Sequence, residues 1–126
     1  MGTFYICPTP IGNLNDISTR LIQVLSEVDI VYAEDTRVAK KLLSHLNQKK
    51  EVRSYFKGNE VKKIDEILNL LDDDKSIAMI SDAGTPLISD PGNTLVKKLI
   101  KSNVEIVSIP GPVSYTHLRA HETETN

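Results

Sequence analysis

The sequence predicts an α/β fold: a five-stranded, mainly parallel sheet with helices on both of its faces. Short apolar runs alternate along the chain with longer segments whose apolar residues recur at helical spacing. This alternation is typical of parallel sheets, because two parallel neighbours need a crossover connection that is usually a helix. The 126 residues are enough for one domain with an ordinary hydrophobic core.

Five short runs predict the strands. They are residues 4–7, 30–33, 52–56, 77–80 and 104–109, and they are rich in β-branched and aromatic residues. Runs of this kind are typical of strands that are buried on both faces of a sheet. In open parallel sheets ligands bind beyond the carboxyl ends of the strands, so we expect a site in the segments that follow these runs.

Four amphipathic segments predict helices, at residues 16–27, 36–46, 59–71 and 91–102. The apolar residues expected on their buried faces are Ile17, Leu21, Val24, Leu25 and Val28; Val38, Leu42, Leu43 and Leu46; Val61, Ile64, Ile67, Leu68 and Leu71; and Leu95, Val96, Leu99 and Ile100. Asp16, Asp35 and Asp90 are the expected N-caps, because an aspartate can accept from the free N–H groups of a first turn. Pro91 suits the first helical position, where its missing N–H costs nothing.

Composition narrows the class of protein. The net charge of −2 indicates neither a polyanionic nor a membrane partner for the chain as a whole. The single cysteine, Cys7, excludes an internal disulfide and fits a reducing compartment. There is no run of about eighteen apolar residues and no basic lead before an apolar N-terminal stretch. We therefore expect a cytoplasmic protein without a transmembrane helix or signal peptide.

The most distinctive segment is SDAGTPLISDPG, at residues 81–92, between the fourth strand and the fourth helix. It is longer than the two to six residues that usually make such a connection. Asp82 stands at the end of a buried strand, where an unpaired carboxylate is costly, and Gly84 leaves room for a ligand to approach the backbone. Thr85 and Asp90 offer further polar contacts. A double turn made rigid by two prolines is the alternative, and we favour the ligand site.

Two other loops lie at the same edge. The segment PTPIGNL after the first strand has neither the G-x-G-x-x-G spacing nor a P-loop, which disfavours a dinucleotide or triphosphate ligand. Gly12 in this loop either allows a ligand to approach or belongs to a rigid turn. After the second strand, Glu34 and Arg37 either pair with each other or face a substrate, while Asp35 caps the next helix.

Positive charge is concentrated in residues 37–63. This segment has nine basic and two acidic residues, which leaves a net charge of +7 in an otherwise acidic chain. Such a stripe is the electrostatic pattern expected for contact with a phosphate backbone, although lysines on solvated helix faces are the common alternative. Tyr55 and Phe56, which lie among the basic residues, either stack on a nucleotide or belong to the strand core.

Four segments occur together in one order: CPTPIGNLNDIS, YAEDTR, SDAGTPLISDPGNTLV and IPGP. In these segments the chain resembles the tetrapyrrole methylase family, in its branch that methylates ribosomal RNA. The resemblance covers residues 3–112. It implies transfer of a methyl group from S-adenosylmethionine to the ribose 2′-oxygen of a cytidine in 16S ribosomal RNA of the small subunit. It also implies a two-domain chain, with the methyl donor between the domains, and usually a homodimer.

The resemblance also implies roles for individual residues. The donor pocket would be walled by Pro10, Gly12, Asp82, Ala83, Gly84, Thr85, Pro110, Gly111 and Pro112. The residues facing RNA would be Arg37, Lys40, Lys41, Lys49, Arg53 and Lys57. The transfer must align the hydroxyl with the methyl group and assist loss of the proton, and it requires no metal. Asp16, Glu34 and Asp35 are the carboxylates at this edge, and Glu34 is our candidate base.

The last segment, VSYTHLRAHETETN at residues 113–126, departs from the family pattern and has no core-forming periodicity. We expect it to be a non-native, disordered tail, with the second domain absent and this chain inactive by itself. His117 and His121 share helical spacing, but we expect no metal site because no further ligand is near. Two alternatives stay open: a methylase of a small tetrapyrrole-like substrate, and a fragment that binds without catalysis.

Overall fold

The computed structural model describes residues 1–9, 17–56, 58–82 and 94–109, and the account below is confined to them. The elements along the chain are β1 (Thr3–Thr9), α1 (Thr19–Glu27), β2 (Ile30–Ala33), α2 (Thr36–His45), β3 (Glu51–Ser54), α3 (Glu60–Asp72), β4 (Ile77–Asp82), α5 (Thr94–Lys101) and β5 (Glu105–Ser108). The strands form one sheet in the order β3-β2-β4-β1-β5, and all neighbours are parallel. The predicted fold class is confirmed.

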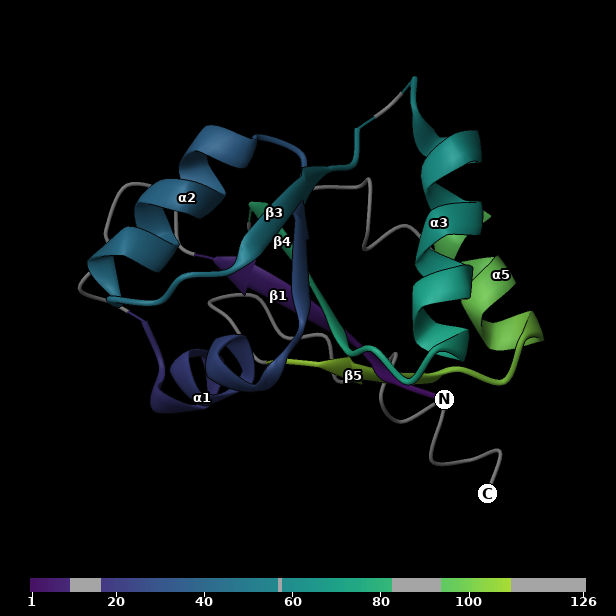
Figure 1. The fold of residues 1–126 in the computed structure, drawn as a ribbon, viewed down its shortest axis with the longest axis horizontal. Coiled ribbons are helices and arrows are strands. Elements are labelled where there is room, and N and C mark those ends of the chain that lie inside the picture. The colour runs from purple at the N-terminus through teal and green to yellow at the C-terminus, as the bar shows by residue number, and fades with distance from the viewer. Residues whose placement is uncertain (10–16, 57, 83–93, 110–126) are drawn as a thin grey trace.

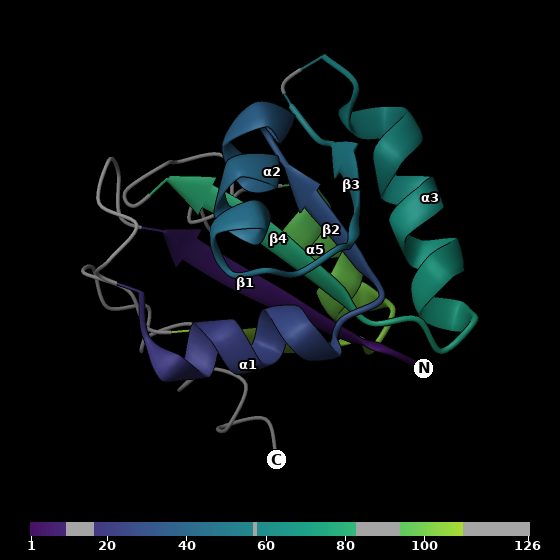
Figure 2. The same cartoon turned by 60° about the vertical axis from the view of Figure 1, so that its left-hand side comes forward.

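The helices cover both faces of the sheet, with α1 and α2 on one side and α3 and α5 on the other (Figures 1 and 2). Side chains alternate along each strand between these two layers. In β1, for example, Phe4 and Ile6 belong to the core on the α3–α5 side, and Cys7 belongs to the core on the α1–α2 side. The strands are apolar on both faces because each face is covered.

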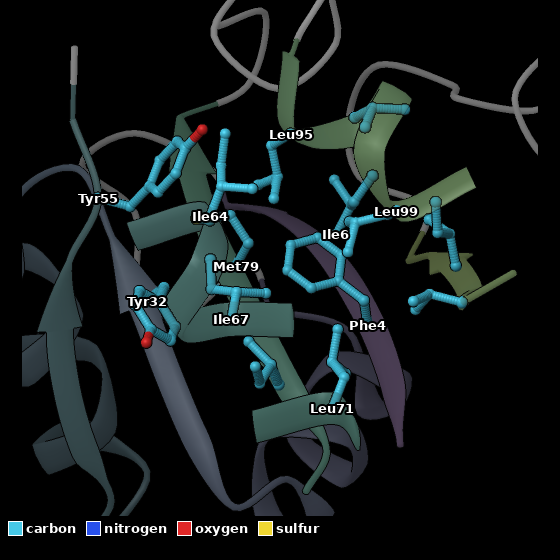
Figure 3. Packing of buried hydrophobic residues seen from close by; sticks show 14 of the residues in the cluster. Phe4, Ile6, Tyr32, Tyr55, Ile64, Ile67, Leu71, Met79, Leu95 and Leu99 are labelled. Carbon is cyan, nitrogen blue, oxygen red and sulfur yellow. The ribbon is translucent and has the colours of Figure 1, made fainter. Parts of the chain in front are cut away.

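The larger core lies between the sheet and the α3–α5 pair (Figure 3). Ile67 and Leu71 project from α3, and Leu99 projects from α5, toward Phe4 and Met79 of the sheet. All five side chains are almost completely buried. Burial of a side chain of this size contributes about 1.5–3 kcal/mol, so these contacts hold the two helices on the sheet.

The start of α1 differs from the prediction. Ser18 is the N-cap, since its side-chain oxygen accepts from the Leu21 backbone N–H at 3.1 Å. The assignment of Asp16 as the cap was therefore wrong. Ile17 packs against the core from the position before the cap, so its apolar character marks the entry of the chain into the helix. The prediction of Asp35 as the cap of α2 is confirmed.

Three residues expected on buried helix faces are exposed: Val38 by 46%, Val61 by 82% and Ile100 by 48%. In α2 the buried stripe is formed by Ala39, Leu42 and Leu43, so Val38 lies at its flank. In a helix of eight to thirteen residues, periodicity alone does not locate the centre of the buried stripe. Within the described ranges, no helix is long and apolar enough to cross a membrane.

Candidate functional site

The carboxyl ends of three central strands meet at one edge of the sheet. The parallel register places Pro8 beside Ser81 and Thr9 beside Asp82, and it places Ala33 of β2 beside Ile80 of β4. Glu34 directly follows β2 and so lies level with the end of β4. Because the segments predicted to wall the donor pocket follow β1, β4 and β5 in the chain, this edge is the candidate site.

The structure describes only part of the predicted site. The predicted donor-pocket residues outside the described ranges are Pro10, Gly12, Ala83, Gly84, Thr85, Pro110, Gly111 and Pro112. Lys57 of the predicted RNA surface, the caps Asp90 and Pro91, and the tail 113–126 with its two histidines also lie outside them. The backbone of Asp82 is described and ends β4, as expected. Among the described residues, no cluster of three or more His, Cys, Asp or Glu side chains could hold a metal ion.

In the segment after β2, the neighbouring carboxylates of Glu34 and Asp35 have different surroundings. The Asp35 side chain accepts from the Arg37 backbone N–H at 3.0 Å and pairs with Arg37 Nε at 3.3 Å. Hydrogen bonds from the Arg37 side chain and backbone lower the pKa of Asp35. Glu34 is exposed and makes no ion pair or hydrogen bond with another described side chain. Arg37 therefore pairs with Asp35 and not with Glu34, which leaves the Glu34 carboxylate available at the edge.

Two buried hydroxyls lie near the same edge. Ser108 ends β5 beside Ile6, and Tyr55 follows β3 and donates its N–H to the Ala33 carbonyl oxygen at 2.9 Å. Neither hydroxyl has a hydrogen-bond partner in the described part of the chain. Burial raises the pKa of Tyr55 to about 12, so its hydroxyl keeps its proton at neutral pH. The ring belongs to the core (Figure 3), which confirms the core interpretation of Tyr55 over stacking; Phe56 is exposed.

The basic segment is divided between the two faces of the sheet. Arg53 of β3 lies on the α3 side, where it pairs with Glu51 and with Glu66 of α3. The distance from Arg53 Nη1 to Glu66 Oε1 is 3.1 Å. Tyr32 also hydrogen-bonds to Glu66, and Lys63 lies 3.7 Å from it. Glu66 lies outside residues 37–63, so the charge of that segment does not include it. It neutralises part of the charge that the sequence assigned to a single stripe.

The α2 side carries Lys40, Lys41, Lys49 and Lys50. Lys62 and Lys63 belong to α3 on the other face. Lys50 Nζ donates to the carbonyl oxygens of Ser26 and Val28, at 2.9 and 2.7 Å, and so binds the C-terminal end of α1. Lys40, Lys41 and Lys49 are exposed and form no ion pair with another described residue. Among the described residues, they are the members of the predicted RNA surface on this face that form no ion pair; Arg37 is exposed but pairs with Asp35.

Residues 3–121 match the model of the family described as "Tetrapyrrole (Corrin/Porphyrin) Methylases". Three similar proteins are named ribosomal RNA small subunit methyltransferase I. They come from Buchnera aphidicola (45% identity over 99% of this chain and 44% of the relative), Mycoplasmopsis pulmonis (43%, over 92% and 52%) and Thermotoga maritima (46%, over 92% and 52%). The chain thus spans about half the length of these relatives or less.

The fold also matches a solved structure. A conserved hypothetical protein from Aeropyrum pernix K1 superposes with a TM-score of 0.66 over 87% of this chain and 39% of that protein. The two sequences are 16% identical, so this match concerns the fold alone.

Proposed function

The chain belongs to the tetrapyrrole methylase family, and from this premise we propose that it is part of an S-adenosylmethionine-dependent methyltransferase. The substrate in this proposal is 16S ribosomal RNA in the small ribosomal subunit, methylated at the ribose 2′-oxygen of a cytidine in the cytoplasm. The observation that carries it is the identity of 43–46% to three ribosomal RNA small subunit methyltransferases over at least 92% of this chain.

We place the methyl donor beyond the carboxyl edge, held by residues 10, 12, 82–85 and 110–112. The described part of this edge fits a polar ligand, because the buried Ser108 hydroxyl has no partner among the described residues. Such a group costs about 1–3 kcal/mol when it stays unsatisfied. When bound, the donor supplies an electrophilic methyl group.

Glu34 is the proposed base that accepts the proton of the ribose hydroxyl. It lies at the carboxyl edge, it is exposed, and the neighbouring Asp35 is already used as a helix cap. A positioned general base typically contributes 10²- to 10⁴-fold to a rate. Lys40, Lys41 and Lys49 would hold the RNA, together with Arg37 and Lys57.

The proposal includes a second domain that completes the donor cleft and a homodimer of the full-length protein. The lengths of the relatives support the second domain, since this chain covers 44–52% of them. The 126-residue chain is then expected to transfer no methyl group by itself.

The test uses the full-length protein that carries this domain, labelled S-adenosylmethionine and methyl-deficient small subunits. We expect label in 16S RNA that survives alkaline hydrolysis as a dinucleotide, because a methylated 2′-oxygen cannot attack the adjacent phosphate. Glu34→Gln should lower kcat by about 100-fold or more while donor affinity is kept. Glu27→Gln, an exposed glutamate at the end of α1, is the matched control.

Three results would contradict the proposal. Label on a base would exclude the ribose as the acceptor, and label on a porphyrinoid but not on RNA would favour the tetrapyrrole alternative. Full activity of Glu34→Gln would exclude this residue as the base.

A further inference from the structure

An open groove lies between the end of α2 and the start of β3. Its volume is about 470 Å³, and Leu43 and Val52 form its apolar part. Since α2 begins directly after the carboxyl end of β2 and leads to the amino end of β3, it carries the chain away from the candidate site. Its ten residues span about 15 Å. The α2–β3 groove is therefore a surface separate from that site.

The groove is basic. Of the described residues that line it, three are lysines, Lys40, Lys49 and Lys50, and none is acidic. Lys50 is held by the carbonyl oxygens of α1, whereas Lys40 and Lys49 are exposed. Ser44 and Asn47 add a hydroxyl and an amide. Two exposed ammonium groups, with a neutral hydroxyl and amide in the same lining, suit the oxygens of phosphate groups.

Gln48 adds a hydrogen-bond acceptor to this lining. Its Nε2 makes only a weak contact with the Ile22 carbonyl oxygen, at 3.4 Å. Its Oε1 is buried without a donor in the described part of the chain. Gln48 lines the groove, and rotation of its amide to meet a donor there would give up only this long contact. A ligand that combines phosphates with a hydroxyl donor satisfies both the lysines and Gln48.

We propose that the α2–β3 groove binds an RNA backbone segment outside the methylation site. Lys40 and Lys49 contact successive phosphates, and the Gln48 amide oxygen accepts from a ribose 2′-hydroxyl, which DNA lacks. This inference rests on the proposed function and names the surface that holds the RNA away from the reacting ribose. An open groove suits a polymer that passes through it better than a small anion that must be enclosed.

The charge test uses the 126-residue chain and fluorescein-labelled RNA and DNA 12-mers of the same base sequence. Lys40→Glu/Lys49→Glu should weaken RNA binding about tenfold or more. It should also reduce the slope of log K against log salt by roughly 1.4, or 0.7 for each lost contact. Lys97→Glu/Lys101→Glu on α5 changes the net charge equally on the opposite face and should have little effect. Thermal unfolding verifies that each variant is folded.

The second test addresses Gln48. Gln48→Met should abolish the preference for RNA over DNA and leave DNA affinity unchanged. The inference would be overturned by any of three results. These are equal losses of RNA affinity in the two double charge reversals, an unchanged preference for RNA over DNA in Gln48→Met, or competition by polyglutamate equal to that by RNA. Because these measurements need neither the donor nor turnover, they are separate from the methyl-transfer assay. If the protein transfers methyl groups but the groove variants bind RNA normally, only the groove inference is refuted. If the groove binds RNA but no methyl transfer occurs, only the proposed methyltransferase function is refuted.

Discussion

Gly2 lies where the chain before β1 passes the end of α3. Its N–H donates to the Leu71 carbonyl oxygen at 2.8 Å. A Cβ atom at this position would lie 1.8 Å from the carbonyl oxygen of Lys75, which is backbone and cannot rotate away. At this residue it is the closeness of two backbone segments, and not the backbone conformation, that requires glycine.

We therefore expect Gly2→Ala to destabilise the protein by about 1–3 kcal/mol, the usual cost of forcing extra atoms into a packed site. The measurement is the midpoint of urea unfolding. Lys75→Ala removes an exposed side chain but keeps the carbonyl, and it should change stability by less than about 0.5 kcal/mol. An alanine at position 2 that leaves the midpoint unchanged would mean that the two segments separate freely.

Among the elements, α1 and β3 are connected by one lysine. Lys50 comes directly before β3 and donates to the Ser26 and Val28 carbonyl oxygens at the end of α1. Carbonyl groups at a helix C-terminus lack partners within the helix and carry partial negative charge. The ammonium group satisfies two of them and joins segments that are more than twenty residues apart.

Lys50→Met keeps most of the aliphatic stem and removes the charge. We expect a loss of about 1–2 kcal/mol in the free energy of unfolding, because hydrogen bonds to a charged group are among the stronger ones. Lys49→Met, the exposed neighbour, should leave stability within about 0.5 kcal/mol. Urea unfolding of both variants checks this, and equal effects would show that Lys50 is no more than a solvated charge.

At the scale of the whole molecule, carboxylates that are paired in the folded state set the response to acid. Glu66 accepts hydrogen bonds from Tyr32 and Arg53, and so joins α3 to two strands. Burial opposes the charged form, but these hydrogen bonds and the nearby Lys63 outweigh it, and the pKa of Glu66 is lowered. A carboxylate whose pKa is lower in the folded state stabilises the protein at pH values above its pKa in the unfolded chain. That contribution is lost as the pH falls through the folded-state pKa.

Glu66→Gln should therefore cost about 1–2 kcal/mol at pH 7. The difference from the wild-type protein should shrink below about pH 4, where the glutamate of the unfolded chain is protonated. Unfolding midpoints at pH 7, 5, 4 and 3 provide the measurement, with Asp65→Asn, an exposed carboxylate on the same helix, as control. A constant difference across this range would exclude ionisation of Glu66 as the cause.

Local patterns in the sequence were sufficient for the fold class, the strand and helix order and the Asp35 cap. Each depends on neighbours within a few residues, such as alternating apolar runs or an aspartate before a helix. The cap of α1 was predicted at Asp16, whereas the N-cap is Ser18, two residues later.

Only the tertiary structure decided how the basic residues are used. Arg53 and Lys50 are neighbours of Lys49 in the sequence, but the pleat directs Arg53 to the α3 side while Lys50 contacts α1. Their partners, Glu66 and the end of α1, are 13 or more residues away along the chain. A count of charges along a segment does not show such pairing. The strand order β3-β2-β4 and the placement of helices on opposite faces determine which charges meet.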